Sequence, residues 1–543
     1  MHTYLPKILA CVLLIVVSPP VAAGESTLQF SPYDFETEHH GSIDAQVAYF
    51  DVPTRHDDHD GSRMRLRVVR LPALAGASQR PPIVYLAGGP GGSGVGTARG
   101  QRWPVFDEVR KHADVLLLDQ RGTGLSGRVD DCPYRHEFKP GQSADPQGYL
   151  SQLNAVASRC VKLWRSQGID LDAYNTIDSA HDIESLRIAL GVDQISLWGM
   201  SYGTHLAMAT LRLHGEHVDR AVLMGVEGPD DTLKLPLSAD ALLEQLADRL
   251  QRDDSATKLT PDLIATLQRV LSRLEQSPVE ARVRRPFDSR VLTIGKFDAQ
   301  LAIAAALGRV QTARLLPLAI SEADQGNYDV LAEFVHAVRQ ELGSFSAMQL
   351  AMDIASGASA ARRERIAQGE RDSILGPALN FPFPGISADL GIRELDAEFR
   401  APLESAVPTL FISGSLDGRT PPVNAESAAT GFVNGRQLVI EGAGHDGDLW
   451  LSHGAIPITI ANFFAGEPTT DTVLVTPPVR FADSVFVELW RALILNHDGS
   501  IRGVAMSVGF AFVLLLAGSG YWMHGHIIKC RASPIRRLER QKS

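Results

Sequence analysis

Apolar runs alternate with helical patterns through the first half of the chain. The apolar runs cover Pro82–Ala87, Asp114–Asp119, Gln194–Trp198 and Arg220–Gly225. Segments with helical spacing cover Tyr149–Ser166, Ser179–Leu190 and Tyr202–Leu213. Strands that are apolar on both faces are typical of a parallel sheet covered by helices. The pattern predicts an α/β domain with a mostly parallel sheet, preceded by β-rich runs at Ala45–Val52 and Met64–Leu71.

The alternation stops after the fourth run. From Gly228 to Leu395 the pattern is helical throughout, with leucines at helical spacing such as Leu242, Leu246 and Leu250. Strands resume at Val407–Ser413 and Gln437–Glu441, and an amphipathic helix follows at Pro457–Ala465. An insertion between two parallel strands lies over the carboxyl edge of the sheet, where ligands bind. We therefore expect a helical cap at 228–395, with the core divided into 24–227 and 396–466.

The first 23 residues have the features of a secretory signal. Lys7 precedes the apolar run Ile8–Val17, which ends at Pro19-Pro20, and small residues follow up to Ala23. Cleavage is expected near Ala23. The alternative interpretation is an N-terminal membrane anchor, but the run is about half the roughly 20 residues that a spanning helix needs.

A second apolar segment lies near the C-terminus. Val504–Trp522 carries no charge and is long enough to span a bilayer, and the tail at 523–543 is strongly basic. Excess basic residues stay on the cytoplasmic side. The expected protein is single-pass, with its large domain periplasmic or extracellular and its C-terminus cytoplasmic. Residues 467–503 are expected to be a linker and juxtamembrane segment, in which Phe481–Leu495 is either an interfacial helix or an ordinary packing helix.

Composition narrows the function. The chain has 543 residues, 44% of them hydrophobic, and a formal net charge of −11. This composition excludes a disordered chain, and the acidic balance argues against nucleic acid as a partner.

Outside the cytoplasm, Cys132 and Cys160 are in a compartment that permits disulfides, so we predict a bridge between them. Two buried free thiols are the alternative.

The strongest chemical motif is Gly199-Met200-Ser201-Tyr202-Gly203. It follows an expected strand and opens an expected helix, which is the context of a nucleophile elbow. A serine nucleophile needs a histidine base and an acid, in the chain order Ser, Asp or Glu, His. Asp417 and His445 follow the last two expected strands in that order. Glu227 is the rival acid, and Asp446 lies beside the histidine.

Backbone amides are expected to complete the site. One oxyanion donor is the Tyr202 amide, which follows the nucleophile, and the other is the Gly89 amide in the glycine-rich loop Gly88–Gly94. No metal or organic cofactor is required. Gly122–Gly127 matches a dinucleotide motif but leads into no helix, and His56–Asp60 lacks an established metal-ligand spacing.

Three motifs together resemble one family. They are Ala87–Gly94, Asp119–Ser126 and Gly199–Thr204, and Asp417 and His445 complete the set. They resemble the prolyl and tripeptidyl aminopeptidase branch of the α/β-hydrolases, over roughly Pro81–Ala465. The resemblance implies an α/β-hydrolase fold, helices on both faces of the sheet, and a serine peptidase acting on the N-terminus of short peptides. Ala87 departs from the family, many members of which have histidine there, and the C-terminal span is not usual.

An aminopeptidase must also bind a free amine. Glu227, at the entrance to the cap, is the candidate carboxylate, and a structural role at that junction is the alternative. Two other functions remain open: an esterase or lipase on the same scaffold, and a catalytically inactive binding or adhesion protein. The oligomeric state is not predicted.

Overall fold

The computed structural model describes residues 28–58, 61–74, 80–253, 256–285, 288–386 and 390–482. The expected signal at 1–23, the expected span at Val504–Trp522 and most of Phe481–Leu495 lie outside these ranges. Within them, no helix combines the length and the apolar character that crossing a bilayer requires.

Ten strands of the described chain form one sheet, in the order β1-β2-β3-β5-β4-β6-β7-β10-β11-β12. The first three strands, β1 (Ser31–Thr37), β2 (Gly41–Pro53) and β3 (Arg63–Leu71), pair in antiparallel fashion, and β3 also pairs antiparallel with the first of the remaining strands in the sheet, β5. The other strands pair in parallel and are β4 (Ile83–Leu86), β5 (Val115–Asp119), β6 (Ile195–Met200), β7 (Val218–Met224), β10 (Thr409–Gly414), β11 (Gly435–Glu441) and β12 (Thr472–Val475). The predicted mostly parallel sheet is confirmed.

Each central strand contributes side chains to two hydrophobic cores, one on each face of the sheet. In β4, Val84 and Leu86 face one side while Ile83 and Tyr85 face the other. One core packs under α1 (Gly94–Arg99), α2 (Trp103–Val109) and α16 (Ala455–Ala465); the other packs under α3 (Pro146–Ser166), α4 (Thr176–Leu190), α5 (Tyr202–His214) and α14 (Pro422–Ala429). Burial on both faces explains why these strands show no polar alternation.

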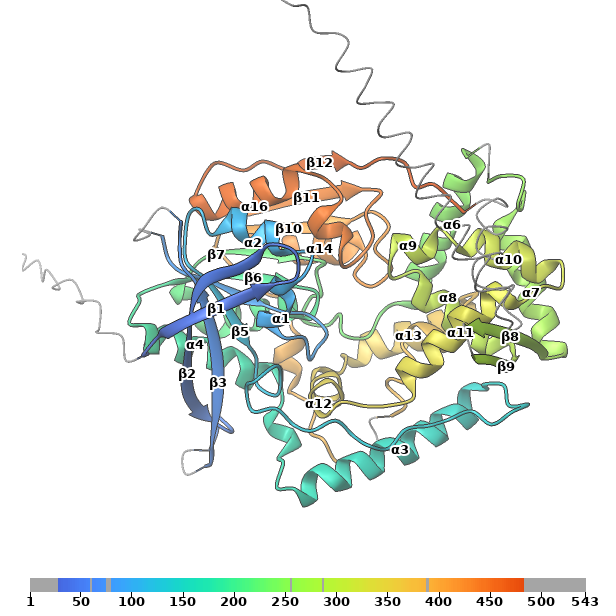
Figure 1. Cartoon of the computed structure of the whole chain (residues 1–543), viewed down its shortest axis with the longest axis horizontal. Helices are drawn as coiled ribbons and strands as arrows, with labels where there is room; N and C mark the ends of the chain where they lie inside the picture. Colours follow the sequence, from blue (N-terminus) through green and yellow to red (C-terminus); the bar gives the residue numbers. More distant parts are fainter. Residues whose placement is uncertain are drawn as a thin grey trace, which may run out of the picture.

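The segment between β7 and β10 lies beyond the carboxyl ends of the strands (Figure 1). Its helices are α6 (Pro236–Gln251), α7 (Leu263–Gln276), α8 (Lys296–Ala306), α9 (Val310–Ala313), α10 (Leu316–Asp324), α11 (Asp329–Leu342), α12 (Ala347–Ser356) and α13 (Ala360–Asp372). The prediction that this segment is helical throughout is wrong at one place, the hairpin of β8 (Val279–Arg285) and β9 (Asp288–Ile294). Apolar and polar residues alternate from Val279 to Val283, which is the period of a strand.

Two edge strands also differ from the predictions. The start of the expected linker, Glu467–Pro478, contributes β12, which pairs with β11 at the sheet edge. The sequence analysis also missed β1, in which Phe35 is the buried hydrophobic residue. Short, mostly polar edge strands carry little hydrophobic signal, because one edge and much of each face stay in water.

The predicted disulfide is confirmed. Cys132, in the loop after β5, is bonded to Cys160 in α3, with 5.5 Å between the Cα atoms. Both side chains are buried. The bridge fixes one end of α3, which runs beneath the cap in Figure 1.

Candidate active site

Ser201 lies on a sharp turn between a strand and a helix. β6 ends at Met200 and α5 begins at Tyr202, so Ser201 has φ 55° and ψ −123°. A positive φ in a residue other than glycine is strained and is found at functional sites. The turn also needs Gly203, because a Cβ there would collide with the carbonyl oxygen of Leu86. The expected strand–turn–helix context is therefore present.

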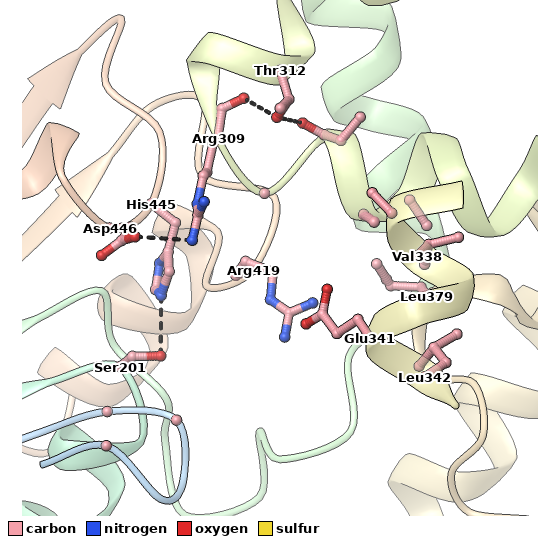
Figure 2. Close-up of a pocket in the computed structure, with 18 of the residues that line it drawn as sticks. Ser201, Arg309, Thr312, Val338, Glu341, Leu342, Leu379, Arg419, His445 and Asp446 are labelled. Carbon is pink, nitrogen blue, oxygen red and sulfur yellow. Dashed lines mark hydrogen bonds and ion pairs between the residues drawn. The ribbon is translucent and has the colours of Figure 1, made fainter. Parts of the chain in front are cut away.

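The structure brings Ser201, His445 and Asp417 together. His445 Nε2 lies 3.0 Å from Ser201 Oγ, and His445 Nδ1 lies 2.7 Å from Asp417 Oδ2. Figure 2 shows the histidine pointing at the serine. These are the contacts by which a base takes the serine proton while an acid orients the base.

Asp417 is buried and fully engaged. Its Oδ1 accepts hydrogen bonds from the Arg419 and Thr420 amides, both at 2.8 Å, and its Oδ2 accepts one from the Thr420 hydroxyl at 2.7 Å. Burial alone would raise the pKa of Asp417, but the charge and hydrogen bond of His445, together with the Thr420 contacts, bring this pKa below its ordinary value. The carboxylate therefore stays ionised beside the histidine. Sequence reasoning missed Thr420, which follows Asp417 by three residues.

The two rival acids lie elsewhere. Glu227 Oε2 accepts a hydrogen bond from Lys234 Nζ at 2.7 Å. Asp446 forms ion pairs with Arg102 and with Arg309, the latter at 3.2 Å. Neither carboxylate contacts His445, so Asp417 is the acid that the geometry selects.

The Gly88–Gly94 loop approaches the nucleophile closely. A Cβ at Gly88 would come within 2.9 Å of Ser201 Cβ, so only glycine fits there. Two residues of the Asp119–Ser126 motif hold this loop from behind. Asp119 Oδ1 accepts the Ser93 hydroxyl at 2.6 Å, and Gln120 Nε2 donates to the Ala87 carbonyl at 2.9 Å.

The predicted oxyanion donors, Gly89 and Tyr202, both lie close to Ser201. Gly89 lines both cavities that open on Ser201. Tyr202 is the first residue of α5, so its amide has no acceptor within the helix. Both amides remain our candidates for holding a developing negative charge.

Two cavities meet at Ser201. The large cavity, of about 540 Å³, is lined by His445 and Ser201 and by the charged residues Arg102, Arg309, Arg419, Glu341 and Asp446. The small cavity, of about 210 Å³, is lined by Ser201 but not by His445. Its charged residues are Glu227, Lys234, Asp353, Glu341 and Arg419.

Asp353 is a functional candidate that sequence reasoning missed. It lies on α12 and faces the small cavity, and its carboxylate has no hydrogen bond or ion pair with any residue that the structure describes. Burial and the neighbouring Glu227 charge raise the pKa of Asp353 to about 7. The available signal was a lone acid in the apolar stretch Leu350–Ala355.

No group of three or more His, Cys, Asp or Glu side chains in the described part of the chain is arranged to hold a metal ion. The comparison with protein families agrees with the fold. The model described as "alpha/beta hydrolase fold" matches residues 81–450, about two thirds of the chain. The chain belongs to the α/β-hydrolase fold family. Its nucleophile elbow, acid and histidine all lie within the matched residues.

Several curated relatives of this α/β-hydrolase are peptidases by name. A tripeptidyl aminopeptidase of Streptomyces lividans is 31% identical over 201 residues, which are 34% of this chain and 36% of the relative. The serine protease Hip1 of Mycobacterium tuberculosis is 27% identical over 188 residues, or 33% and 35%. A putative hydrolase of Escherichia coli, YuaR, is 26% identical over 210 residues, or 37% and 40%. The matches thus span little more than a third of each relative.

Proposed function

We propose that this protein is a serine aminopeptidase that releases N-terminal residues from short peptides through an acyl-enzyme. The observation that carries the proposal is that His445 joins Ser201 to Asp417 by hydrogen bonds where two cavities of different charge meet. The peptidase names of the relatives support the same reaction class.

The proposed mechanism follows from the contacts. His445 Nε2 takes the proton of the Ser201 hydroxyl as the oxygen attacks the substrate carbonyl, and Asp417 stabilises the resulting imidazolium. The Tyr202 and Gly89 amides hold the oxyanion. The imidazolium then protonates the leaving amine. A water molecule, deprotonated by His445, releases the acyl group.

The position of His445 indicates which cavity holds the leaving peptide and which holds the acyl group. The leaving amine takes its proton from His445 Nε2, so the leaving peptide must lie on the side that this histidine lines. That side is the large cavity, and the acyl group therefore lies in the small cavity. A volume of about 210 Å³ is below the range typical of ligand pockets, which favours a short acyl group.

The small cavity has the charge that an aminopeptidase needs. Its lining has three carboxylates, those of Asp353, Glu227 and Glu341, against two cations, Arg419 and Lys234, and Lys234 is paired with Glu227. A substrate ammonium beside Asp353 would supply the missing positive charge, in a site where charge-assisted hydrogen bonds are strong. We therefore assign recognition of the free α-amine to Asp353 together with Glu227.

Three substrates test this function. They are a short peptide with a free N-terminus, the same peptide N-acetylated, and a short-chain acyl ester. We expect kcat/KM for the free peptide to exceed that for the acetylated one by roughly 100-fold, because acetylation removes a buried charge pair. Mass spectrometry of the products gives the number of residues released. Rapid ester hydrolysis with neither peptide cleaved would instead identify an esterase.

We also propose that the catalytic domain is exported and held at the membrane by Val504–Trp522. The length of that segment and the basic tail support this topology, and the Cys132–Cys160 bridge is typical of an oxidising compartment. The full chain should sediment with membranes, and a chain lacking 504–543 should not. Equal solubility of both would contradict the anchor.

A further inference from the structure

We propose that the large cavity binds the C-terminal carboxylate of the substrate, with Arg419 as its main contact and Arg309 as a second. The enzyme would then be selective for peptides short enough to reach Ser201 and these guanidinium groups at once. The proposal rests on the aminopeptidase function above, because that function puts the leaving peptide in the large cavity.

The guanidinium group of Arg419 is available to a ligand. Its amide donates to Asp417, but its guanidinium has no ion pair with any residue of the described ranges. Its aliphatic stem packs against Gly308, where a Cβ would lie 3.3 Å from Arg419 Cγ and Cδ. Figure 2 shows the guanidinium group reaching into the cavity between Ser201 and the cap helix that carries Glu341. Arg419 lines both cavities, so its guanidinium group lies where they join, at the start of the path of the leaving peptide.

A second positive group lies beside the histidine. Arg102 and Arg309 both pair with Asp446, so two guanidinium groups share one carboxylate. Arg309 comes from the cap, and its side chain is 64% exposed. Its planar fork is suited to a second carboxylate.

The two cavities are oppositely biased. Of the charged residues that line only the large cavity, two are cations and one is an anion; of those that line only the small cavity, one is a cation and two are anions. A peptide zwitterion has the same polarity, with its ammonium in the acyl part and its carboxylate in the leaving part. The site is thus complementary to a short peptide with both ends free.

One acid opposes this arrangement. Glu341, on α11, lines both cavities and faces Arg419 in Figure 2, but no ion pair joins the two side chains. It would compete with a substrate carboxylate for the guanidinium group. Replacing it should therefore strengthen selection for the carboxylate.

The test compares one short peptide as the free acid and as the C-terminal amide. We expect wild-type kcat/KM to be about ten-fold higher for the acid, the effect of one charge-assisted hydrogen bond. Arg419→Gln and Arg309→Gln should each lower this acid-to-amide ratio, and their combination should bring it close to one. Glu341→Gln should raise it. The matched control is Arg365→Gln, an exposed cap arginine outside both cavities, which should keep the wild-type ratio.

A second series lengthens the leaving part from one residue to five. The acid preference should disappear once the carboxylate extends beyond the cavity. A wild-type ratio near one, or a ratio that both arginine substitutions and Glu341→Gln leave unchanged, would overturn the proposal. The aminopeptidase function would survive that result, because cleavage of the amide peptide with its free N-terminus is enough to support it.

Discussion

Ser201, Asp417 and His445 each follow a strand of the sheet, and the side chains of all three are joined by hydrogen bonds there. Asp417 alone accepts hydrogen bonds from two amides and a hydroxyl besides its contact with His445. The cap differs: Asp353 and Glu341 face the cavities without ion pairs in the described structure. Side chains that are already hydrogen-bonded to one another are preorganised for catalysis. Charged side chains without an ion pair are available to bind a ligand of opposite charge.

The largest expected effect on catalysis comes from replacing the nucleophile at the sheet edge. Ser201→Ala should lower kcat by about a million-fold, because the triad acts as one unit. Single-turnover and steady-state assays with the free peptide measure this loss. A loss of only a few-fold would mean that another group is the nucleophile.

Asp417→Asn should have the next largest effect on kcat, about 10⁴-fold, because an amide cannot stabilise the imidazolium or fix the required tautomer. Substrate binding should change little, since Asp417 is buried behind His445. A matched control is Glu441→Gln, in which a partly buried carboxylate at the end of β11 is replaced. Equal losses from both substitutions would refute the assignment of the acid.

The sheet edge was predictable from the sequence because its motifs are local. Ser201 and the Gly88–Gly94 loop sit in short contiguous stretches whose glycines are required by close backbone contacts. Asp417 and His445 followed from chain order and from their places after strands.

The cap was less predictable because its site residues have no shared motif. Asp353, Glu341 and Arg309 come from α12, α11 and the loop before α9, and only packing of the cap over the sheet brings them to Ser201. Helical spacing predicted that the cap is helical, as at α6, but it did not predict the hairpin of β8 and β9. Glu227 was found because it directly follows a strand of the sheet, as the triad residues do.

Removal of the disulfide tests how much the bridge stabilises the fold. Cys132 and Cys160 are 28 residues apart in sequence. Replacing both by serine should lower the free energy of unfolding by roughly 3–4 kcal/mol in the chain-entropy model. Denaturant unfolding of the described domain measures this change. An unchanged midpoint would show that the bridge adds no stability.

Asp353→Asn should lower kcat/KM for free peptides by about 10- to 100-fold, through the loss of a charged partner for the ammonium.

The same substitution should stabilise the fold. The pKa of Asp353 is about 7, above its ordinary 3.8. Between those values the folded chain holds a proton that the unfolded chain has released, so stability falls as the pH rises through this window.

Thermal unfolding at several pH values measures that effect. The variant should lack this decrease, and near pH 8 it should exceed the wild type in stability by on the order of 2 kcal/mol. Asp372, an exposed carboxylate at the end of α13 that lines neither cavity at Ser201, is a control site for Asp→Asn. A destabilised Asp353→Asn protein would show that the carboxylate serves the fold rather than a ligand.

The most direct measurement is competition for Ser201 itself. A fluorophosphonate probe should label the wild-type protein at Ser201, as identified by peptide mass mapping, and should not label Ser201→Ala. A short peptide with a free N-terminus should slow this labelling, while the N-acetylated peptide at the same concentration should not. Labelling at another residue, or equal protection by both peptides, would contradict the claim that the sheet edge supplies the nucleophile and the cap selects the amine.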